Sequence, residues 1–187
     1  MKLNKDNFKS AEANNNDYER LPNGAYICSI VEAKDVPDKE YLKIDYDICQ
    51  DDENNKWVGF ASKALQNGLQ FWMLSTIRSY KDTALNMFKG FCEVLDKSND
   101  TSFTADFENL GEVDEEKMNG LDFGAVVCTE HYWKDNGDEG LRYKVKKVFP
   151  VGDFDSYKDK KFDDMYAKDF DKPVATEPKK ESTASFN

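Results

Sequence analysis

Apolar and polar residues alternate along two stretches near the start of the chain. In residues 41–49 every second residue from Leu42 to Ile48 is apolar, and the residues between them are Lys or Asp. Residues 25–31 alternate in a similar way after Leu21-Pro22-Asn23-Gly24, which is a signal for a tight turn. Because successive side chains of a strand point to opposite faces, both stretches are predicted to be strands.

The remaining pattern predicts three more strands and one helix. Strands are predicted at residues 56–60, 121–133 and 141–151, with an Asn-Gly hairpin turn at 135–138 joining the last two. Residues 71–77 fit either a strand or the start of a helical layer. A helix is predicted to begin at its cap residue Asp82 and to end at residues 97–99, since apolar residues follow at helical spacing: Leu85, Phe88, Cys92 and Leu95. The acidic residues 101–119 are predicted to be irregular.

The predicted order is strand, strand, strand, helix, strand, strand. It favours a mainly β, OB-fold-like five-stranded antiparallel barrel with one helix between strands 3 and 4, a partly open architecture that binds oligonucleotides. An α+β domain with an antiparallel sheet is the alternative. The predicted domain covers residues 21–152. A flexible arm, residues 1–20, precedes it, and an acidic and aromatic tail, residues 153–187, follows and is predicted to be largely disordered.

Composition narrows the functional classes. The 187 residues carry a net charge of -11 and suit one domain with some tail left over. No apolar run is long enough to span a bilayer, and residues 1–20 lack the hydrophobic region of a signal peptide, so a cytoplasmic protein is expected. The lone His131 and four scattered cysteines do not predict a metal site or a cofactor. Without a phosphate loop or a nucleophile motif, the chain is predicted not to be an enzyme, and Asp45 and Asp47 are more simply the polar face of a strand.

Two stretches, residues 54–81 and 140–152, contain no Asp or Glu although the chain as a whole is acidic. In the second, Arg142, Lys144 and Lys146 alternate with Tyr143 and Val145, so a strand would place the three cations on one face. Single-stranded nucleic acid suits such a surface, because cations contact phosphates and each base that stacks on an aromatic ring contributes roughly 1–3 kcal/mol. An ordinary solvated strand face is the alternative interpretation.

The hairpin would bring aromatic and basic residues together, and this suggests a binding site. The predicted stacking residues are Trp57, Tyr132, Trp133 and Tyr143. The predicted phosphate contacts are Lys56, Arg78, Arg142, Lys144 and Lys146. In the tail, Phe154, Phe162 and Phe170 stand among acids and are predicted to bind a partner protein or to lie across the basic face, with a merely solubilising tail as the alternative. The sequence leaves a homo-oligomer open.

Several segments resemble small phage-encoded proteins from replication and recombination gene clusters. The opening Leu21-Pro22-Asn23-Gly24-Ala25-Tyr26 is similar to their L-P-x-G-x-Y motif. Further segments resemble the versions of these proteins found in phages of Gram-positive bacteria. They are Ser79-Tyr80-Lys81-Asp82-Thr83-Ala84-Leu85, Phe88-Lys89-Gly90-Phe91, Ser98-Asn99 and Val151-Gly152-Asp153-Phe154. The resemblance covers roughly residues 21–154. The resemblance implies a single-stranded-DNA-binding or recombination accessory protein, and it assigns no DNA-contacting residue.

The expected function is therefore binding of single-stranded DNA with low sequence specificity during phage DNA replication or recombination. Phage or host replication and recombination proteins are the expected partners of the tail. The alternative is an acidic protein-binding module, or a DNA mimic that inhibits a host nucleic-acid enzyme, because the acidic surface could imitate DNA.

Overall fold

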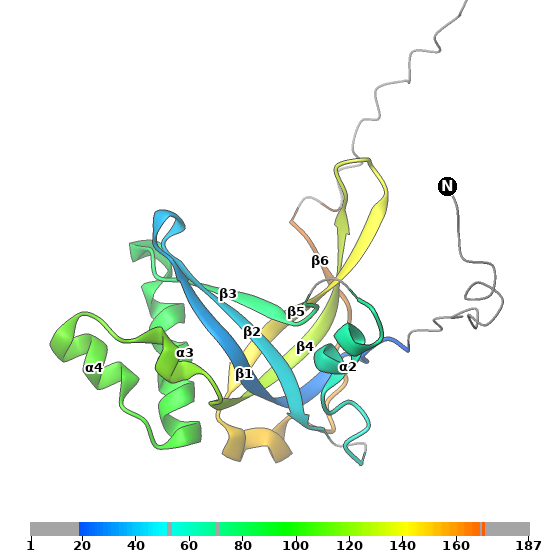
Figure 1. Ribbon diagram of the computed structural model, residues 1–187. Coiled ribbons are helices and arrows are strands. Elements are labelled where there is room, and N and C mark those ends of the chain that lie inside the picture. Colours follow the sequence, from blue (N-terminus) through cyan, green and yellow to red (C-terminus); the bar gives the residue numbers. More distant parts are fainter. Residues whose placement is uncertain (1–18, 52–53, 70–71, 169, 171–187) are drawn as a thin grey trace, which may run out of the picture.

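An antiparallel sheet curled into an open barrel forms the centre of the protein (Figure 1). The computed structural model describes residues 19–51, 54–69, 72–168 and 170. The barrel strands are β1 (Gly24–Val36), β2 (Tyr41–Gln50), β3 (Ser75–Ser79), β4 (Asp122–Trp133) and β5 (Glu139–Phe149), in the order β3-β2-β1-β4-β5. Since β3 and β5 are the two ends of this order, the barrel stays open between them.

The long strand β1 makes the curvature possible. It pairs with β2 over most of its length and with β4 through residues 24–29. Its pairing with β2 shifts register at Ile27/Cys28 and again at Ile30/Glu32. Such bulges bend a strand and increase its twist, and this allows β1 to curve between its pairing with β4 and its pairing with β2. Helix α3 (Leu85–Asn99) lies between β3 and β4 in the chain. The prediction of a mainly β, barrel-like fold with a helix between strands 3 and 4 is confirmed.

The predicted strand at residues 56–60 is wrong. The chain makes turns there and continues into helix α2 (Phe60–Gln66), and the third strand is β3, which overlaps the ambiguous stretch 71–77. Asp47 of β2 explains the helix: its carboxylate accepts the backbone N–H groups of Ala61 and Ser62 at 2.9 and 3.0 Å. These donors have no partner inside a helix, so a carboxylate at this end stabilises it.

Residues 101–119, predicted to be irregular, contain helix α4 (Phe103–Leu110) and the 3-10 turn η3 (Glu115–Met118). Asp96 of α3 accepts the backbone N–H groups of Phe103 and Thr104 at 2.7 and 2.9 Å, which caps α4 from a neighbouring helix. Asp82 does not cap α3. It lies in the 3-10 turn η2 (Asp82–Ala84), for which no side-chain cap bond is present, and α3 follows at Leu85. A third 3-10 turn, η1 (Pro37–Lys39), joins β1 to β2.

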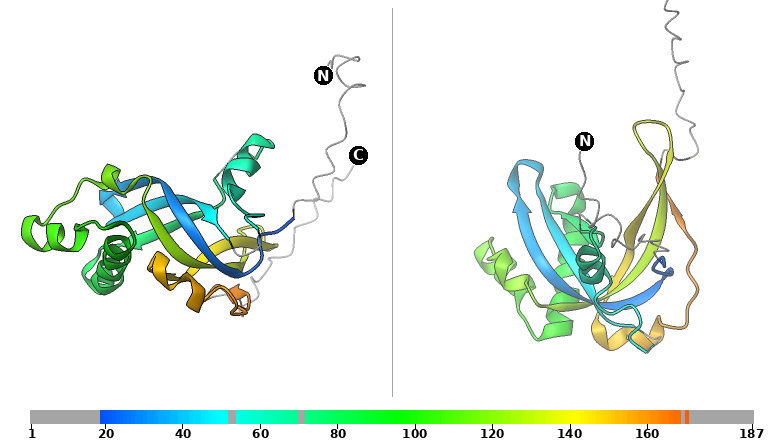
Figure 2. Two further views of the ribbon diagram at one scale, coloured as in Figure 1. Left: turned by 90° about the horizontal axis from the view of Figure 1, so that it is seen from below. Right: turned by 45° about the vertical axis from the view of Figure 1, so that its right-hand side comes forward.

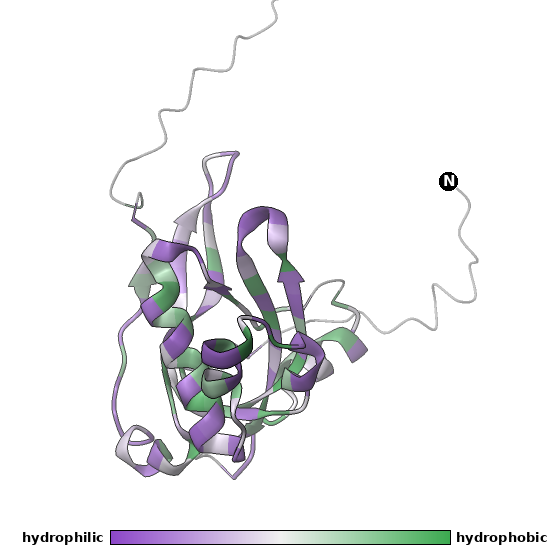
Figure 3. Ribbon diagram, turned by 90° about the vertical axis from the view of Figure 1, so that its left-hand side faces the viewer, coloured by the Kyte–Doolittle hydropathy of each residue, from purple (hydrophilic) through white to green (hydrophobic). Residues whose placement is uncertain are grey.

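Two apolar clusters stabilise the described part of the fold. The larger fills the barrel and the space beneath α3, with Tyr46, Phe91 and Phe123 fully buried in edge-to-face contact. The smaller lies on the outside of β1, β4 and β5, where Phe149 and Phe154 pack over Val126 and Cys128. Gly124 of β4 lies directly under the Phe149 ring, and a Cβ there would be 2.1 Å from a ring carbon. Figure 3 shows α3 and α4 in front of the sheet.

The chain continues to pack beyond Gly152, so the predicted domain boundary falls inside the structure. The 3-10 turn η4 (Val151–Ser156) buries Phe154 against the smaller cluster. The short strand β6 (Met165–Tyr166) then pairs with β4 in parallel at Glu130 and His131. Figure 2 shows this segment running from η4 alongside β4 to the β4–β5 hairpin. The predicted arm up to residue 18 and the tail from residue 171 lie outside the described residues.

Among the helices that the structure describes, none is long and apolar enough to cross a membrane.

Candidate nucleic-acid interface

The residues predicted to form one patch on the β4–β5 hairpin lie on two faces. Arg142 stands over the Tyr132 ring at 4.8 Å, on the face away from the barrel interior, which we call the outer face. Trp133 and Tyr143 point the other way, because adjacent residues of a strand alternate. The prediction of a single patch containing all four residues is therefore wrong, and Tyr132 and Arg142 remain together.

Glu130 organises the cations of the outer face. Its carboxylate is 1% exposed and accepts hydrogen bonds from Arg142 at 2.6 Å and from Lys144 at 2.5 Å. Burial by itself raises the pKa of Glu130, but the hydrogen bonds from Lys144 and Arg142 outweigh it and lower the pKa below its ordinary value. Glu130 is therefore an anion that holds two half-exposed cations in place and offsets one of their two charges.

The cationic surface continues along β5 toward η4. Lys146 and Lys147 are exposed, and Lys147 donates a hydrogen bond to the hydroxyl of Tyr157 at 2.6 Å. Lys147 and Lys160 also lie over the Tyr157 ring, at 4.8 and 4.6 Å from its centroid. We call these residues the basic strip: Arg142, Lys144, Lys146, Lys147 and Lys160, with Tyr132 near one end and Tyr157 near the other.

Acidic residues of the tail approach this face as well. The pKa of Cys128, which lies on the outer face, is raised by burial, lowered by the charge of Lys146 and raised by the charges of Asp164 and Asp163. Asp164 and Asp163 thus add negative charge near Cys128, which limits how far the positive potential of the basic strip extends.

Trp133 is covered by the chain itself. Its indole stacks on Phe170 with ring centroids 5.0 Å apart and an interplanar angle of 7°, and its Nε1 donates to the Phe170 carbonyl at 2.8 Å. Tyr143 belongs to the barrel wall, where its ring meets Phe60 edge to face at 5.5 Å and its hydroxyl accepts the N–H of Leu21 at 3.1 Å. One face of the Trp133 indole is therefore covered by Phe170, and contacts within the barrel hold the Tyr143 ring.

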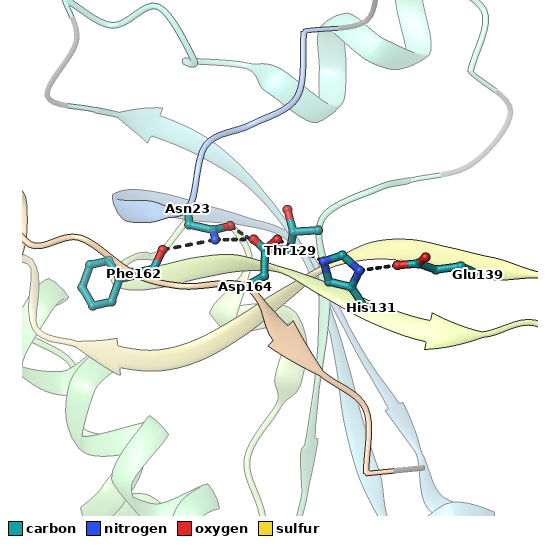
Figure 4. Close-up of polar contacts among 6 residues, drawn as sticks. All are labelled: Asn23, Thr129, His131, Glu139, Phe162 and Asp164. Carbon is teal, nitrogen blue, oxygen red and sulfur yellow. Dashed lines mark hydrogen bonds and ion pairs between the residues drawn. The ribbon is translucent and has the colours of Figure 1, made fainter. Parts of the chain in front are cut away.

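A polar cluster around His131 holds the tail in this position (Figure 4). The imidazole Nε2 lies 3.0 Å from Asp164, and Nδ1 contacts Glu139 of β5. Hydrogen bonds with Asp164 and then Glu139 raise the pKa of His131. The imidazole also stacks on Tyr166 of β6 at 4.8 Å. Because carboxylates occupy both ring nitrogens, the arrangement suits a structural clamp better than proton transfer to a substrate.

Asn23 connects this clamp to the start of the barrel. Its side-chain nitrogen donates to Asp164 at 2.6 Å and to the Phe162 carbonyl at 3.2 Å, and its side-chain oxygen accepts the N–H of Thr129 at 2.7 Å. Sequence reasoning treated Asn23 only as a turn residue and missed this role. The acidic, aromatic composition of residues 162–170 was the available signal, but it did not specify a partner within the same chain.

Three further predicted site residues lie away from the basic strip. Trp57 is 6% exposed and packs against Phe60, so it belongs to the core and has no face for a base. Lys56 stays at the surface, over the Trp57 ring at 4.5 Å and paired with Glu19. Arg78 turns inward, where its guanidinium lies 5.0 Å from the Phe91 centroid and burial lowers its pKa. Its buried Nε and Nη2 have no hydrogen-bond partner in the described structure.

Of the tail phenylalanines predicted to bind a partner, Phe154 is buried, and Phe162 and Phe170 are half-buried against the protein's own surface. Within the described ranges, no group of His, Cys, Asp and Glu side chains is arranged to hold a metal ion.

No protein-family model matches the sequence, and no curated protein or solved structure shows significant similarity to it. The resemblance to phage proteins therefore stays a prediction.

Proposed function

We propose that this protein binds single-stranded DNA with little sequence preference through the basic strip, in phage DNA replication or recombination inside the host cell. The observation that supports this most directly is the strip itself: five cations along the outer face of β5 and the neighbouring turn, with Tyr132 and Tyr157 near its ends. The OB-fold-like barrel adds support, because this architecture commonly binds oligonucleotides.

The proposed contacts divide into phosphate and base contacts. The cations neutralise phosphates and release counterions, and we assign base stacking to the partly exposed Tyr132, because Tyr157 already stacks on Phe149 with ring centroids 4.4 Å apart. Neither kind of contact reads base edges, so the affinity should depend little on sequence. If all five cations contact phosphates, the logarithm of the binding constant should fall with the logarithm of salt concentration with a slope of about -3 to -4.

Fluorescence anisotropy of a labelled oligo-dT strand, titrated at low and moderate salt and compared with duplex DNA, tests the proposal. The informative variant is Lys146→Glu, Lys147→Glu and Lys160→Glu, because it reverses three charges of the strip and leaves the pairs with Glu130 intact. The control variant, Lys34→Glu, Lys63→Glu and Lys97→Glu, makes the same change in net charge at exposed lysines elsewhere.

We expect the strip variant to lose at least tenfold in affinity and the control variant to lose much less. Equal losses would show that only net charge matters and would remove the strip as the site. Failure of the unaltered protein to bind oligo-dT at low salt would refute single-stranded DNA binding altogether.

A different observation favours the second candidate function, an acidic protein-binding module. A pocket lies between α3, α4 and the barrel, and four carboxylates are among the residues that line it.

A further inference from the structure

An apolar pocket opens between the barrel and the two helices α3 and α4. Figure 1 shows these helices on the side of the molecule away from the β4–β5 hairpin. Its volume is about 620 Å³, within the range of pockets that hold ligands or anchoring side chains. Its apolar lining comes from β2, α3, α4 and the segment before β4: Leu42, Leu85, Phe88, Cys92, Phe107, Val113 and Met118. Leu85 is 45% exposed, so part of this apolar surface is open to water.

Four of the polar residues that line the same pocket are acidic. They are Asp35, Glu108, Glu112 and Glu115. Lys89 is the one cation among the lining residues, all of which lie in the described part of the chain, and its amine pairs with Glu108 at 2.6 Å. The pocket therefore combines an apolar floor with an excess of negative charge.

Tyr80, which lines the pocket, lies close to several of these carboxylates. Its hydroxyl donates to Asp35 at 2.7 Å. This hydrogen bond, followed by burial and by the charges of Asp35, Glu40 and Glu115, raises the pKa of Tyr80 to about 12. Carboxylates from β1, η3 and the β1–β2 turn thus act together on one hydroxyl that lines the pocket.

We propose that this pocket docks a cationic amphipathic segment of a partner protein, with an apolar anchor side chain in the pocket and Lys or Arg residues against the surrounding carboxylates. A polyanion such as DNA would be repelled here, and a neutral apolar ligand would gain nothing from the acids. An apolar anchor framed by complementary charges is a common form of peptide recognition. The pocket and the basic strip lie on different sides, so this docking does not depend on DNA binding.

The test uses two fluorescein-labelled synthetic peptides of equal charge, one with Lys-Leu-Ala-Lys-Leu-Ala-Lys repeats and one in which Ala replaces every Leu. Fluorescence anisotropy with the full chain should show at least tenfold tighter binding of the leucine peptide. Since both peptides carry the same charge, this difference separates anchoring from simple attraction to an acidic protein.

Val113→Glu puts a charge into the apolar lining while making the protein more acidic. Binding by attraction alone would keep or gain affinity, whereas anchoring in the pocket should lose at least tenfold. Ile77→Glu is the matched control, because Ile77 is 58% exposed on β3 and does not line the pocket. Leu85→Glu provides a second pocket variant at a more exposed position, in case circular dichroism shows that Val113→Glu does not fold.

The proposal is overturned if the two peptides bind equally, or if the folded pocket variants bind the leucine peptide as tightly as the Ile77→Glu control does.

Discussion

Removing the cations that bind Glu130 should destabilise the fold more than removing Glu130 itself. The carboxylate is 1% exposed, whereas the side chains of Arg142 and Lys144 are 55% and 47% exposed. After Glu130→Gln, both cations can turn into water. After Arg142→Ala and Lys144→Ala, the carboxylate stays buried without its two charged partners.

The expected magnitudes follow from this difference in burial. Leaving a buried charge without its partners costs about 3–5 kcal/mol of unfolding free energy. Glu130→Gln loses charge-assisted hydrogen bonds to half-exposed partners and should cost about 1 kcal/mol. A triple variant, Glu130→Met with Arg142→Ala and Lys144→Ala, removes the ionic group altogether and should recover most of the loss of the double variant, to within about 2 kcal/mol of the unaltered protein.

Urea denaturation followed by circular dichroism measures these differences. Because folding lowers the pKa of Glu130, the stability that its ion pairs contribute is present above its ordinary pKa of 4.5 and is lost as the pH falls through the lower folded-state value. The difference in unfolding free energy between the double variant and the unaltered protein should therefore become smaller at acidic pH. If the double variant is no less stable than Glu130→Gln at neutral pH, the assigned role of Glu130 is wrong.

Three further predictions concern the glycine under Phe149 and the contacts of the tail. Gly124→Ala should lower the unfolding free energy by about 2 kcal/mol or more in a thermal melt, because the new methyl group must displace the Phe149 ring, and a loss under about 0.5 kcal/mol would contradict this packing. Folding raises the pKa of His131, so the stabilisation that His131 gives the tail is complete below about pH 6.5 and is lost as the pH rises through its folded-state pKa. Hydrogen exchange should show this as a pH-dependent protection of the tail amides, and the pH dependence should disappear in His131→Gln. Phe170→Ala should shift the emission of Trp133 to the red and, if the uncovered indole then stacks on bases, should tighten oligo-dT binding; an unshifted spectrum would argue against the contact.

Local sequence patterns predicted those elements whose buried and exposed faces follow from the spacing of their own apolar residues. Alternation in residues 41–49 identified β2, and helical spacing identified most of α3. Alternation also placed Arg142 and Lys144 on one face of β5, which the structure confirms through their shared contact with Glu130. The same rule would have separated Trp133 from Tyr132, because adjacent strand residues point in opposite directions.

Tertiary structure decided the features that depend on partners far apart in the chain. The caps of α2 and α4 come from Asp47 and Asp96, which belong to other elements, so residues 56–66 and 101–119 gave no clear local signal. Glu130 became the partner of the basic residues only through the register between β4 and β5. Asn23 lies beside Asp164 only because the chain turns back along β4 after η4.

The physical reason for this division is the range of the interactions. Side-chain direction along a helix or strand is set by backbone geometry within a few residues, and a sequence displays that period openly. Which surfaces meet depends on packing, strand register and hydrogen bonds between distant residues, and each of these contributes only about a kilocalorie per mole or a few. The sequence by itself therefore determined the strands, the main helix and the shared face of the cations, and only the folded chain determined which acids face them, which aromatic rings are covered and where the acidic pocket lies.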